Sequence, residues 1–413
     1  MEEITLDKKI ILGLQHVLAM FGATVLVPML TGLNPAVALL SAGVGTLIFH
    51  ACTKGIVPVF LGSSFAFITA IQLTLATHGM AAVKGGIIAA GIIYILMGGI
   101  IKLVGVEVIQ SFFPPIVIGP VIMIIGLRLS GTAFEMIGYT RIGETNMFTI
   151  PLKGILVAAT VVITMVIVSI YAKGFFKLVP ILMAVVTGYL LAWALGMVDT
   201  SIITKANWLG YSAAARSDLF TMPRFSLESI IAIAPIALVV FIEHIGDITT
   251  NGTVVGKNFF ENPGVHRTLL GDGLATIAAG LLGGPANTTY GENTGVLAVT
   301  KVYDPGVIRI AAIIAILLSG VGKFGGLVQA IPDPVMGGVS IILFGMIASI
   351  GVRMLVENQV DFSVSRNMLI ASIILVTGIG VDNIQIVGTI TISGLAIAAL
   401  IGIVLNKIIP EHI

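Results

Sequence analysis

Apolar stretches of about 20 residues recur along the whole chain and are separated by short polar segments. A run of that length crosses the ~30 Å hydrocarbon core of a bilayer as an α-helix, and it is too long for the ~10-residue alternating strands of a membrane barrel. The pattern predicts an all-α integral membrane protein with fourteen transmembrane segments. They lie near residues 10–31, 34–53, 56–76, 80–104, 112–131, 149–171, 176–198, 228–250, 266–284, 285–302, 306–328, 334–352, 366–380 and 388–408.

Composition narrows the class of protein further. Of the 413 residues, 57% are hydrophobic and 10% are charged, whereas about a quarter of the residues in soluble domains are charged. So few charges cannot cover the surface of a soluble globule, which argues against a soluble enzyme, a nucleic-acid-binding protein and a disordered chain. The net charge of +1 gives no attraction to a polyanion, and the single cysteine, Cys52, cannot form an intrachain disulfide.

The 21 lysine and arginine residues orient the predicted spans. If the N-terminus is cytoplasmic, most of them fall on inner loops and span ends, and many of the outer ones belong to the long loops 132–148 and 199–227, where the positive-inside rule is weakest. Residues 1–9 lack the basic start and cleavage site of a signal peptide, so the first run should remain as a span. We therefore expect a multi-pass protein of the cytoplasmic membrane with both termini cytoplasmic.

Two pairs of passages indicate an internal repeat. The segment 115–119, followed by Gly126, resembles the segment 334–338, followed by Gly345, and each opens a predicted span. Segments 58–65 and 285–292 are both too polar for a lipid-facing helix, and each precedes a short apolar helix. Interrupted spans at corresponding positions of two inverted halves point to the binding site of a transporter. The sequence thus predicts seven plus seven spans with the third and tenth broken. The alternative is that the two polar segments are ordinary loops.

Three acidic residues fall at membrane depth, namely Glu243, Asp247 and Glu292. An aspartate at the centre of a bilayer costs about 2.5–3.5 kcal/mol on insertion scales, so such groups persist where they have a partner or a function. Glu243 and Asp247 are four residues apart and share a helix face, where one of them tends to hold a proton. Glu292 lies where the broken tenth span resumes as helix. Pairing with buried bases is the structural alternative, but no Lys or Arg lies near them in the same spans.

Several neutral and aromatic side chains complete the candidate site. Phe65 and, as weaker candidates, Tyr290 and Phe344 could stack on a flat ligand, with ordinary packing as the alternative. His244 should project toward a neighbouring helix, while Gln15 and His16 are expected to support the site rather than touch a ligand. Asp272, between two glycines, is interpreted as a helix cap.

The chain carries no nucleotide-binding loop of the form G-x-x-x-x-G-K-[ST] and no metal-ligand spacing. It has no nucleophile–base constellation either, so an enzyme is not expected. These features predict a secondary transporter without metal or cofactor, in which intramembrane carboxylates carry protons.

Three motifs resemble one transporter family. Glu292-Asn293-Thr294-Gly295, followed by Thr300-Lys301, fits every fixed position of the signature of the nucleobase–ascorbate transporter (nucleobase:cation symporter 2) family. The Gln15-His16 pair and the segment from Phe241 to Asp247 also resemble that family. The resemblance covers the whole chain. It is strongest to the bacterial uracil permeases, because they carry Glu at the first signature position, whereas xanthine and urate carriers typically carry Gln.

The resemblance implies a fold and an activity. It implies a core domain made of residues 1–104 (spans 1–4) and 228–330 (spans 8–11), a gate domain made of residues 105–227 (spans 5–7) and 331–413 (spans 12–14), and short antiparallel strands in spans 3 and 10. It also implies proton-coupled import of uracil by alternating access of one domain against the other, and a homodimer.

The resemblance also implies residue roles. Glu243 and Glu292 would bind the base, Phe65 would stack on it, and the backbone around Tyr290 and Gly291 would assist. Asn293 would support the site with the residues named above. Some uracil permeases have His at the position of Asp247, so the detail of proton coupling is left open.

Two other functions remain as alternatives. One is transport of a different base, such as xanthine or hypoxanthine, which the Glu at position 292 disfavours. The other is an anion exchanger or channel on the same fold, which the three acids disfavour because an anion carrier needs a cationic or neutral midplane.

Overall fold

The computed structural model describes the chain except residues 1–4, 106–107, 109–110, 142–147, 388–389 and 411–413. Its first half comprises α1 Leu6–Thr31, α2 Pro35–Cys52, β1 Leu61–Ser63, the 3-10 turn η1 Phe65–Phe67, α3 Ile68–Val104, α5 Pro115–Ile137, β2 Thr140–Arg141, β3 Phe148–Thr149, α6 Leu152–Tyr171, the 3-10 turn η2 Gly174–Leu178 and α7 Pro180–Ala194. The short helices α8 Thr200–Lys205 and α9 Ala213–Phe220 follow.

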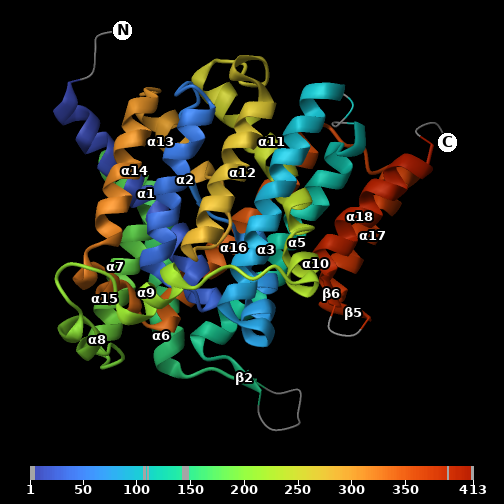
Figure 1. Ribbon diagram of the computed structural model, residues 1–413. Coiled ribbons are helices and arrows are strands. Elements are labelled where there is room, and N and C mark those ends of the chain that lie inside the picture. The colour runs from blue at the N-terminus through green and yellow to red at the C-terminus, as the bar shows by residue number, and fades with distance from the viewer. Residues whose placement is uncertain (1–4, 106–107, 109–110, 142–147, 388–389, 411–413) are drawn as a thin grey trace.

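The second half comprises α10 Leu227–Ile233, α11 Ile236–Val255, the turn η3 Phe260–Gly264, α12 Val265–Leu282, β4 Asn287–Thr289, α13 Gly291–Thr300, α14 Pro305–Ser319, α15 Gly322–Gln329, α16 Asp333–Glu357, α17 Ser365–Gly380, β5 Asn383–Val387, β6 Ile390–Ser393 and α18 Gly394–Ile408. Figure 1 shows the long helices side by side, with the start of α1 and the end of α18 at the same end of the molecule.

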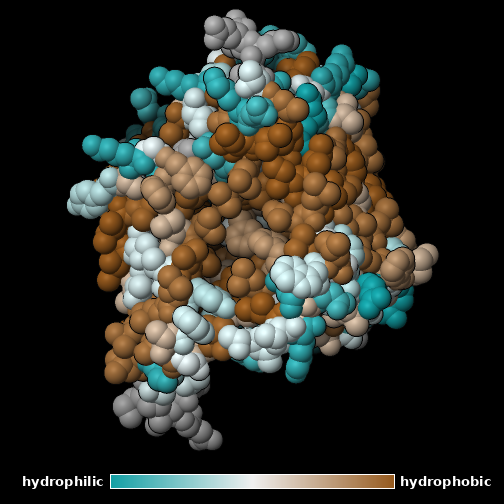
Figure 2. Space-filling view, turned by 90° about the vertical axis from the view of Figure 1, so that its left-hand side faces the viewer, coloured by the Kyte–Doolittle hydropathy of each residue, from teal (hydrophilic) through white to brown (hydrophobic). Residues whose placement is uncertain are grey.

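The predicted membrane-spanning character agrees with the helix lengths. Seven helical stretches of the described residues are long and apolar enough to cross a bilayer, and the pair α14–α15, bent by 84°, would make an eighth. The helices α7, α17 and α18 are apolar but shorter. Figure 2 shows a broad band of hydrophobic side chains between hydrophilic margins, as expected for a surface that faces lipid.

One helix is longer than a membrane is thick. At 1.5 Å per residue, α3 would measure about 55 Å if it were straight. Gly79 interrupts it with φ 76° and ψ 178°, a backbone conformation that side-chain-bearing residues rarely adopt. The kink falls between the predicted spans 56–76 and 80–104 and separates a helix that follows β1 from a second, independent helix.

The helices form two packed groups. In one, α12 packs against α2 and α3, and α14 packs against α1 and α2; in the other, α16 packs against α5 and α6, α6 against α7, and α17 against α5 and α18. Glycines allow the closest approaches. A Cβ at Gly91 would meet the carbonyl of Gly273 between α3 and α12, and a Cβ at Gly119 would meet the carbonyl of Gly351 between α5 and α16. Small residues at such contacts are typical of membrane helix pairs.

Two short strands connect distant parts of the first group. The strands β1 and β4 pair antiparallel, with Leu61 opposite Thr289 and Ser63 opposite Asn287, and both are buried. Each strand continues into a helix, β1 through η1 into α3 and β4 into α13. Because the strands run in opposite directions, the two helices leave the pair in opposite directions.

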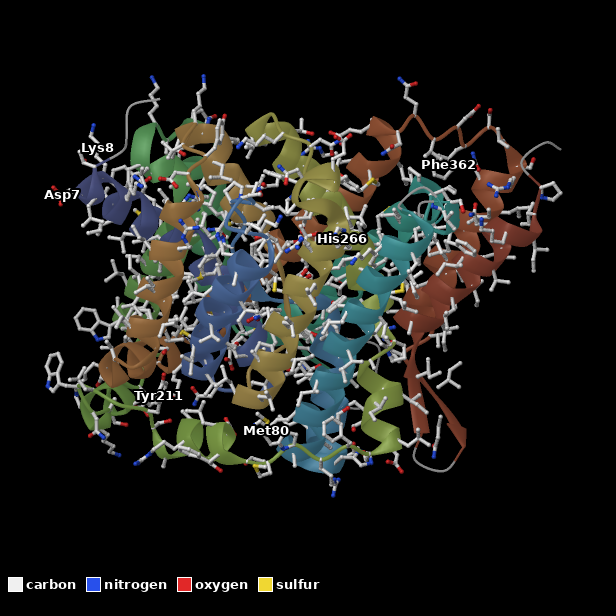
Figure 3. The ribbon with its side chains drawn as sticks, turned by 45° about the horizontal axis from the view of Figure 1, so that its top comes forward. Asp7, Lys8, Met80, Tyr211, His266 and Phe362 are labelled. Atoms are coloured by element: carbon white, nitrogen blue, oxygen red, sulfur yellow. The ribbon has the colours of Figure 1, made fainter. Side chains whose placement is uncertain are left out.

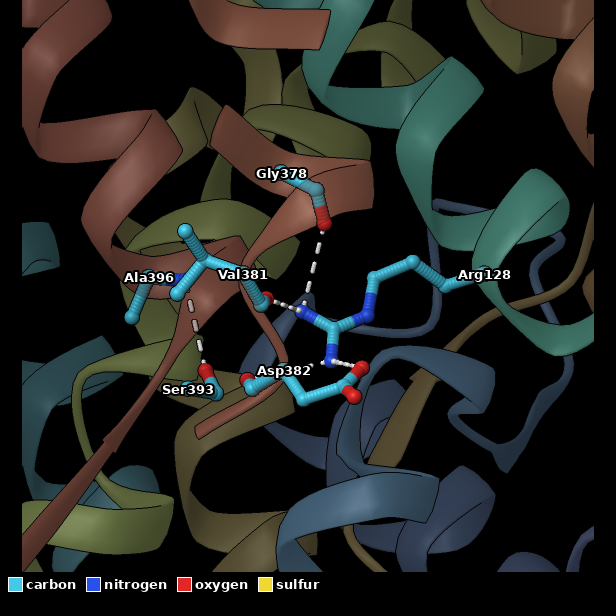
Figure 4. A network of polar contacts seen from close by, with 6 residues as sticks. All are labelled: Arg128, Gly378, Val381, Asp382, Ser393 and Ala396. Carbon is cyan, nitrogen blue, oxygen red and sulfur yellow. Dashed lines mark hydrogen bonds and ion pairs between the residues drawn. The ribbon is translucent and has the colours of Figure 1, made fainter. Parts of the chain in front are cut away.

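Arg128, a cation within α5, donates most of its hydrogen bonds to backbone carbonyls. Figure 4 shows Nη1 of Arg128 donating to the carbonyls of Gly378 (3.3 Å) and Val381 (2.9 Å), while Nη2 donates to the carbonyl of Asp382 (3.1 Å). Its side chain is 9% exposed, whereas that of Asp382, its ion-pair partner at 3.4 Å, is 94% exposed. Arg128 therefore acts mainly as a cap for the C-terminal end of α17, where carbonyls lack partners within the helix.

Lys84 is bound in the same way. It is fully buried on α3, and its Nζ donates to the carbonyls of Asp218 (2.6 Å), Leu219 (3.3 Å) and Thr221 (2.6 Å) at the end of α9. These contacts fasten the segment after α7 to α3.

Candidate functional site

The three predicted acids lie close together. Glu243 and Asp247 are one turn apart on α11, and Glu292 is the second residue of α13. Glu243 lies within electrostatic range of both Asp247 and Glu292. The structure thus brings together carboxylates that are about 50 residues apart in sequence, and α13 starts there because the β1–β4 pairing fixes the chain just before it.

Asp247 is held by the strand pair. Its Oδ2 accepts a hydrogen bond of 2.6 Å from Oγ1 of Thr289, the last residue of β4. This contact ties α11 to β4 and orients the Asp247 carboxyl. The sequence analysis did not single out Thr289, although its place in the polar segment before Glu292 was a signal that could have suggested it.

The predicted aromatic residues come from both helix groups. Phe65 begins η1, directly after β1, and Phe344 lies on α16 and is 2% exposed. Their ring centroids are 6.1 Å apart and the ring planes meet at 81°. Because this contact is edge-to-face rather than parallel, Phe344 does not stack flat on Phe65. Phe65 is only partly buried.

The start of α13 leaves the backbone N–H of Gly291 without a hydrogen bond among the described residues. The N–H of Tyr290 donates to the carbonyl of Phe60, and its hydroxyl donates to the carbonyl of Ser63 at 3.0 Å. The carboxyl of Glu292 accepts from the N–H of its own residue. Among the described residues no hydrogen bond uses the N–H of Gly291, which is exposed. The structure therefore places Gly291, rather than Tyr290, where its backbone could bind a ligand.

His16 and Asn293 bind each other. Nδ2 of Asn293 lies 3.1 Å from Nδ1 of His16 and donates to the carbonyl of His16 at 3.1 Å, which joins α13 to α1. Both residues are buried, and Oε1 of Gln15 has no hydrogen-bond partner among the described residues. His16 and Asn293 thus hold α13 against α1.

Asp272 is not a helix cap, so that interpretation was wrong. It lies in the interior of α12, fully buried, with Oδ2 3.1 Å from Nδ1 of His244. Nε2 of His244 lies 2.9 Å from Oγ1 of Thr268, also on α12. His244 therefore faces the neighbouring helix, as predicted, and its contacts with Thr268 and Asp272 hold α11 beside α12. Glycines on both sides of an aspartate allow a neighbouring helix to approach closely, so this sequence pattern could have indicated that Asp272 lies at a helix contact.

A cavity of about 250 Å³ opens beside Glu292. Its walls come from both helix groups: α1 and α13 contribute Ala19, Glu292 and Val296, and α6, η2, α7 and α16 contribute most of the others. Apart from Glu292, its charged lining residue in the described chain is Lys177, which is exposed. A largely apolar cavity with one carboxylate suits a small neutral molecule with a polar edge.

The described residues hold no group of three or more His, Cys, Asp or Glu side chains that could bind a metal ion. None of the acids Glu243, Asp247 and Glu292 forms an ion pair with a lysine or arginine among the described residues. The site can therefore accept hydrogen bonds and exchange protons.

The sequence model of the Permease family (Xan_ur_permease) matches residues 7–387. The chain belongs to this family, that of the nucleobase:cation symporters 2, and it is a permease rather than an enzyme. Among its relatives, the uracil permease of Bacillus caldolyticus is 45% identical over 98% of this chain and 93% of its own length. The uracil permease of Escherichia coli (strain K12) is 42% identical over 96% and 90%, respectively.

Solved structures share the fold at much lower identity. The transmembrane domain of the cyanobacterial bicarbonate transporter BicA has a TM-score of 0.64 at 14% identity over 98% of both chains. The murine anion transporter Slc26a9 in its inward-facing state has a TM-score of 0.73 at 10% identity over 98% of this chain and 68% of its own. The protein is thus a multi-pass membrane permease with the transporter fold of these proteins.

Proposed function

We propose that the protein imports uracil together with protons across the cytoplasmic membrane. The observation that carries this proposal is the grouping of Glu243, Asp247 and Glu292 at the paired strands, in a chain whose relatives are uracil permeases. Uracil, the lipid bilayer and a second copy of the chain are its proposed partners, and the proton is the coupling ion, with no cofactor.

The proposed contacts use the hydrogen-bonding groups of uracil. The base has two N–H donors, which the carboxylates of Glu243 and Glu292 would accept, and two carbonyls, one of which the free N–H of Gly291 would serve. Phe65 would stack on the ring. Each hydrogen bond to a charged acceptor contributes about 1.5–3 kcal/mol.

Proton coupling rests on the acids that face each other. Carboxylates this close cannot all stay ionised around a neutral ligand in a dry site, so binding favours uptake of a proton. Asp247 is the proposed carrier, because its orientation by Thr289 leaves Glu243 to bind the base. Release of that proton to the cytoplasm completes an electrogenic cycle.

Alternating access would move one helix group against the other. In this proposal the core, residues 1–104 and 228–330, and the gate, residues 105–227 and 331–413, form a fourteen-span inverted repeat with spans 3 and 10 broken at β1 and β4. The two packed helix groups and the cavity between them support this division. The start of α1 and the end of α18 lie at the same end of the molecule, which supports placing both termini on one side of the membrane, in this proposal the cytoplasmic side.

Two competing functions make different demands on the site. A carrier of another base would prefer xanthine or hypoxanthine over uracil. An anion exchanger is suggested by the names of the solved neighbours, but carboxylates that form no ion pair with a lysine or arginine among the described residues would repel an anion.

The deciding experiment is uptake of radiolabelled uracil into proteoliposomes with and without an inward proton gradient. We expect gradient-driven accumulation that unlabelled uracil abolishes and that xanthine, bicarbonate and chloride leave intact. Uptake that follows an anion gradient, or competition by xanthine stronger than by uracil, would refute the proposal.

A further inference from the structure

A second cavity, of about 380 Å³, lies far from the acids. Its walls are the segment that contains α8 and the start of α9, together with α15 and the start of α2. Figure 1 places α8, α9 and α15 at the end of the molecule opposite the start of α1, and Tyr211, a wall residue, lies toward that end in Figure 3. In the orientation proposed above, this end faces outward.

The walls carry positive charge without acids. Lys205 and Arg216 line the cavity, and no aspartate or glutamate occurs among its described lining residues. Neither cation forms an ion pair or a hydrogen bond with another described residue. The acid that acts electrostatically on Lys205 is Asp199, whose carboxyl already accepts from the N–H of Ser201.

Three helix N-termini add to this charge. The first residues of α9 and α15, Ala213 and Gly322, and the second residue of α2, Ala36, lie in the wall. Each N-terminus carries a partial positive charge. Of the three wall residues, Ala213 has an N–H that forms no hydrogen bond with another described residue, whereas those of Ala36 and Gly322 donate to Asn34 and to the carbonyl of Trp208. The opposing C-terminal end of α8 is neutralised, because Nζ of Lys323 donates to the carbonyls of Ile203 (2.8 Å) and Thr204 (2.9 Å).

An amide donor on a buried residue is also available. Asn34 is 6% exposed and lines the cavity, and its Oδ1 accepts from the N–H of Ala36 at 3.0 Å. No hydrogen bond of its Nδ2 occurs among the described residues. This nitrogen is itself accessible rather than fully buried, so it can donate to an occupant of the cavity that accepts hydrogen bonds.

We propose that this cavity binds a phosphate-type anion. Arginine, lysine, amide donors and helix N-termini are the groups that recognise phosphate oxygens. Trp208 and Leu209 follow the lining residue Asn207 in the chain, and they are 77% and 78% exposed. Exposed tryptophan is typical of the headgroup level of a membrane. The same chemistry fits the phosphodiester of an anionic lipid headgroup and free phosphate. Either would fasten the segment 199–216 to α2 and α15.

The test uses the purified full chain and compares two sources of the anion, an anionic lipid headgroup and free phosphate. One arm counts phosphatidylglycerol molecules retained by the protein in native mass spectrometry, with phosphatidylcholine as the neutral comparison. The other titrates inorganic phosphate in detergent by calorimetry against chloride at equal ionic strength. We expect specific binding in at least one arm, and the arm that responds identifies the source.

Variants test whether anion binding depends on this cavity or on the positive charge of the surface in general. The double variant Lys205→Gln/Arg216→Gln should weaken binding about tenfold or more, as loss of a charged hydrogen bond predicts. Lys173→Gln, at an exposed lysine outside the cavity, should leave binding unchanged. Asn34→Asp keeps an oxygen that caps α2 but places a carboxylate in the wall, so it should also abolish binding. Equal binding by the wild type and the double variant, or no binding of either probe, would overturn the proposal, whether or not uracil is transported.

Discussion

Replacing Glu292 by Gln is the sharpest test of the transport site. The change keeps the length of the side chain and an oxygen that can accept from the residue's own N–H, as the carboxyl does now. It removes the negative charge that would accept an N–H of the base. A hydrogen bond to a charged group contributes about 1.5–3 kcal/mol, so the Kd for uracil should rise by about 10- to 150-fold.

The measurement is calorimetric titration of uracil into purified wild type and Glu292→Gln, with xanthine as a second ligand. Glu135→Gln, at an exposed glutamate on α5, is the matched control and should bind uracil as the wild type does. A folded Glu292→Gln protein with wild-type uracil affinity would show that this carboxylate is not a ligand of the base.

The remaining predictions concern stacking, coupling and stability. Phe65→Ala should weaken uracil binding about 2- to 12-fold in calorimetry, for loss of an aromatic contact of about 0.5–1.5 kcal/mol, while the protein stays monodisperse; unchanged affinity would contradict stacking. Asp247→Asn keeps an oxygen for the neighbouring threonine, so proteoliposomes should still exchange uracil but lose accumulation driven by a pH gradient; intact accumulation would exclude Asp247 as the proton carrier. Lys84→Met leaves three carbonyls without their charged donor, so Tm should fall while the uracil Kd stays unchanged; a Tm equal to that of the wild type would contradict the anchoring role. Partial burial alone would raise the pKa of Asp304, but hydrogen bonds from Lys9 and from a backbone N–H outweigh it and lower the pKa. This contact therefore stabilises the fold fully above the ordinary carboxylate pKa of about 4, and the stabilisation is lost as the pH falls from there through the lowered pKa of folded Asp304. Asp304→Asn should accordingly flatten the fall in Tm on acidification, and an equally steep fall would argue against the contact.

The hydrophobic pattern located most of the helices because a span is a property of a local stretch of chain. The predicted runs 10–31, 34–53 and 149–171 coincide closely with α1, α2 and α6. The pattern gave no sign of the 84° bend between α14 and α15 within the run 306–328. That bend depends on how α15 packs against α8, which hydropathy does not record.

The contacts of the candidate site are also of two kinds: local pairs, which the sequence predicts, and contacts between distant elements, which it does not. Glu243 and Asp247 could be paired from the sequence because four residues make one helical turn. The contact of Asp272 with His244, and that of Thr289 with Asp247, join elements that are distant along the chain. Such pairs follow from the packing of helices on one another, so a single sequence without aligned relatives does not reveal them.

The paired strands would allow the proposed site to lie at membrane depth. Backbone groups that leave a helix in an apolar environment need partners, and the β1–β4 pairing supplies them while freeing the first turn of α13. Glu292 and Phe65 lie on one side of the boundary between the two helix groups, and Phe344, on α16, lies on the other. A ligand bound between them contacts both groups, so a movement of one group past the other changes its exposure. The polar contacts that hold Asp247, Asn293 and His244 all lie within the proposed core. In this proposal the binding groups would move as a unit, and access to them would change without loss of the geometry that binds the ligand.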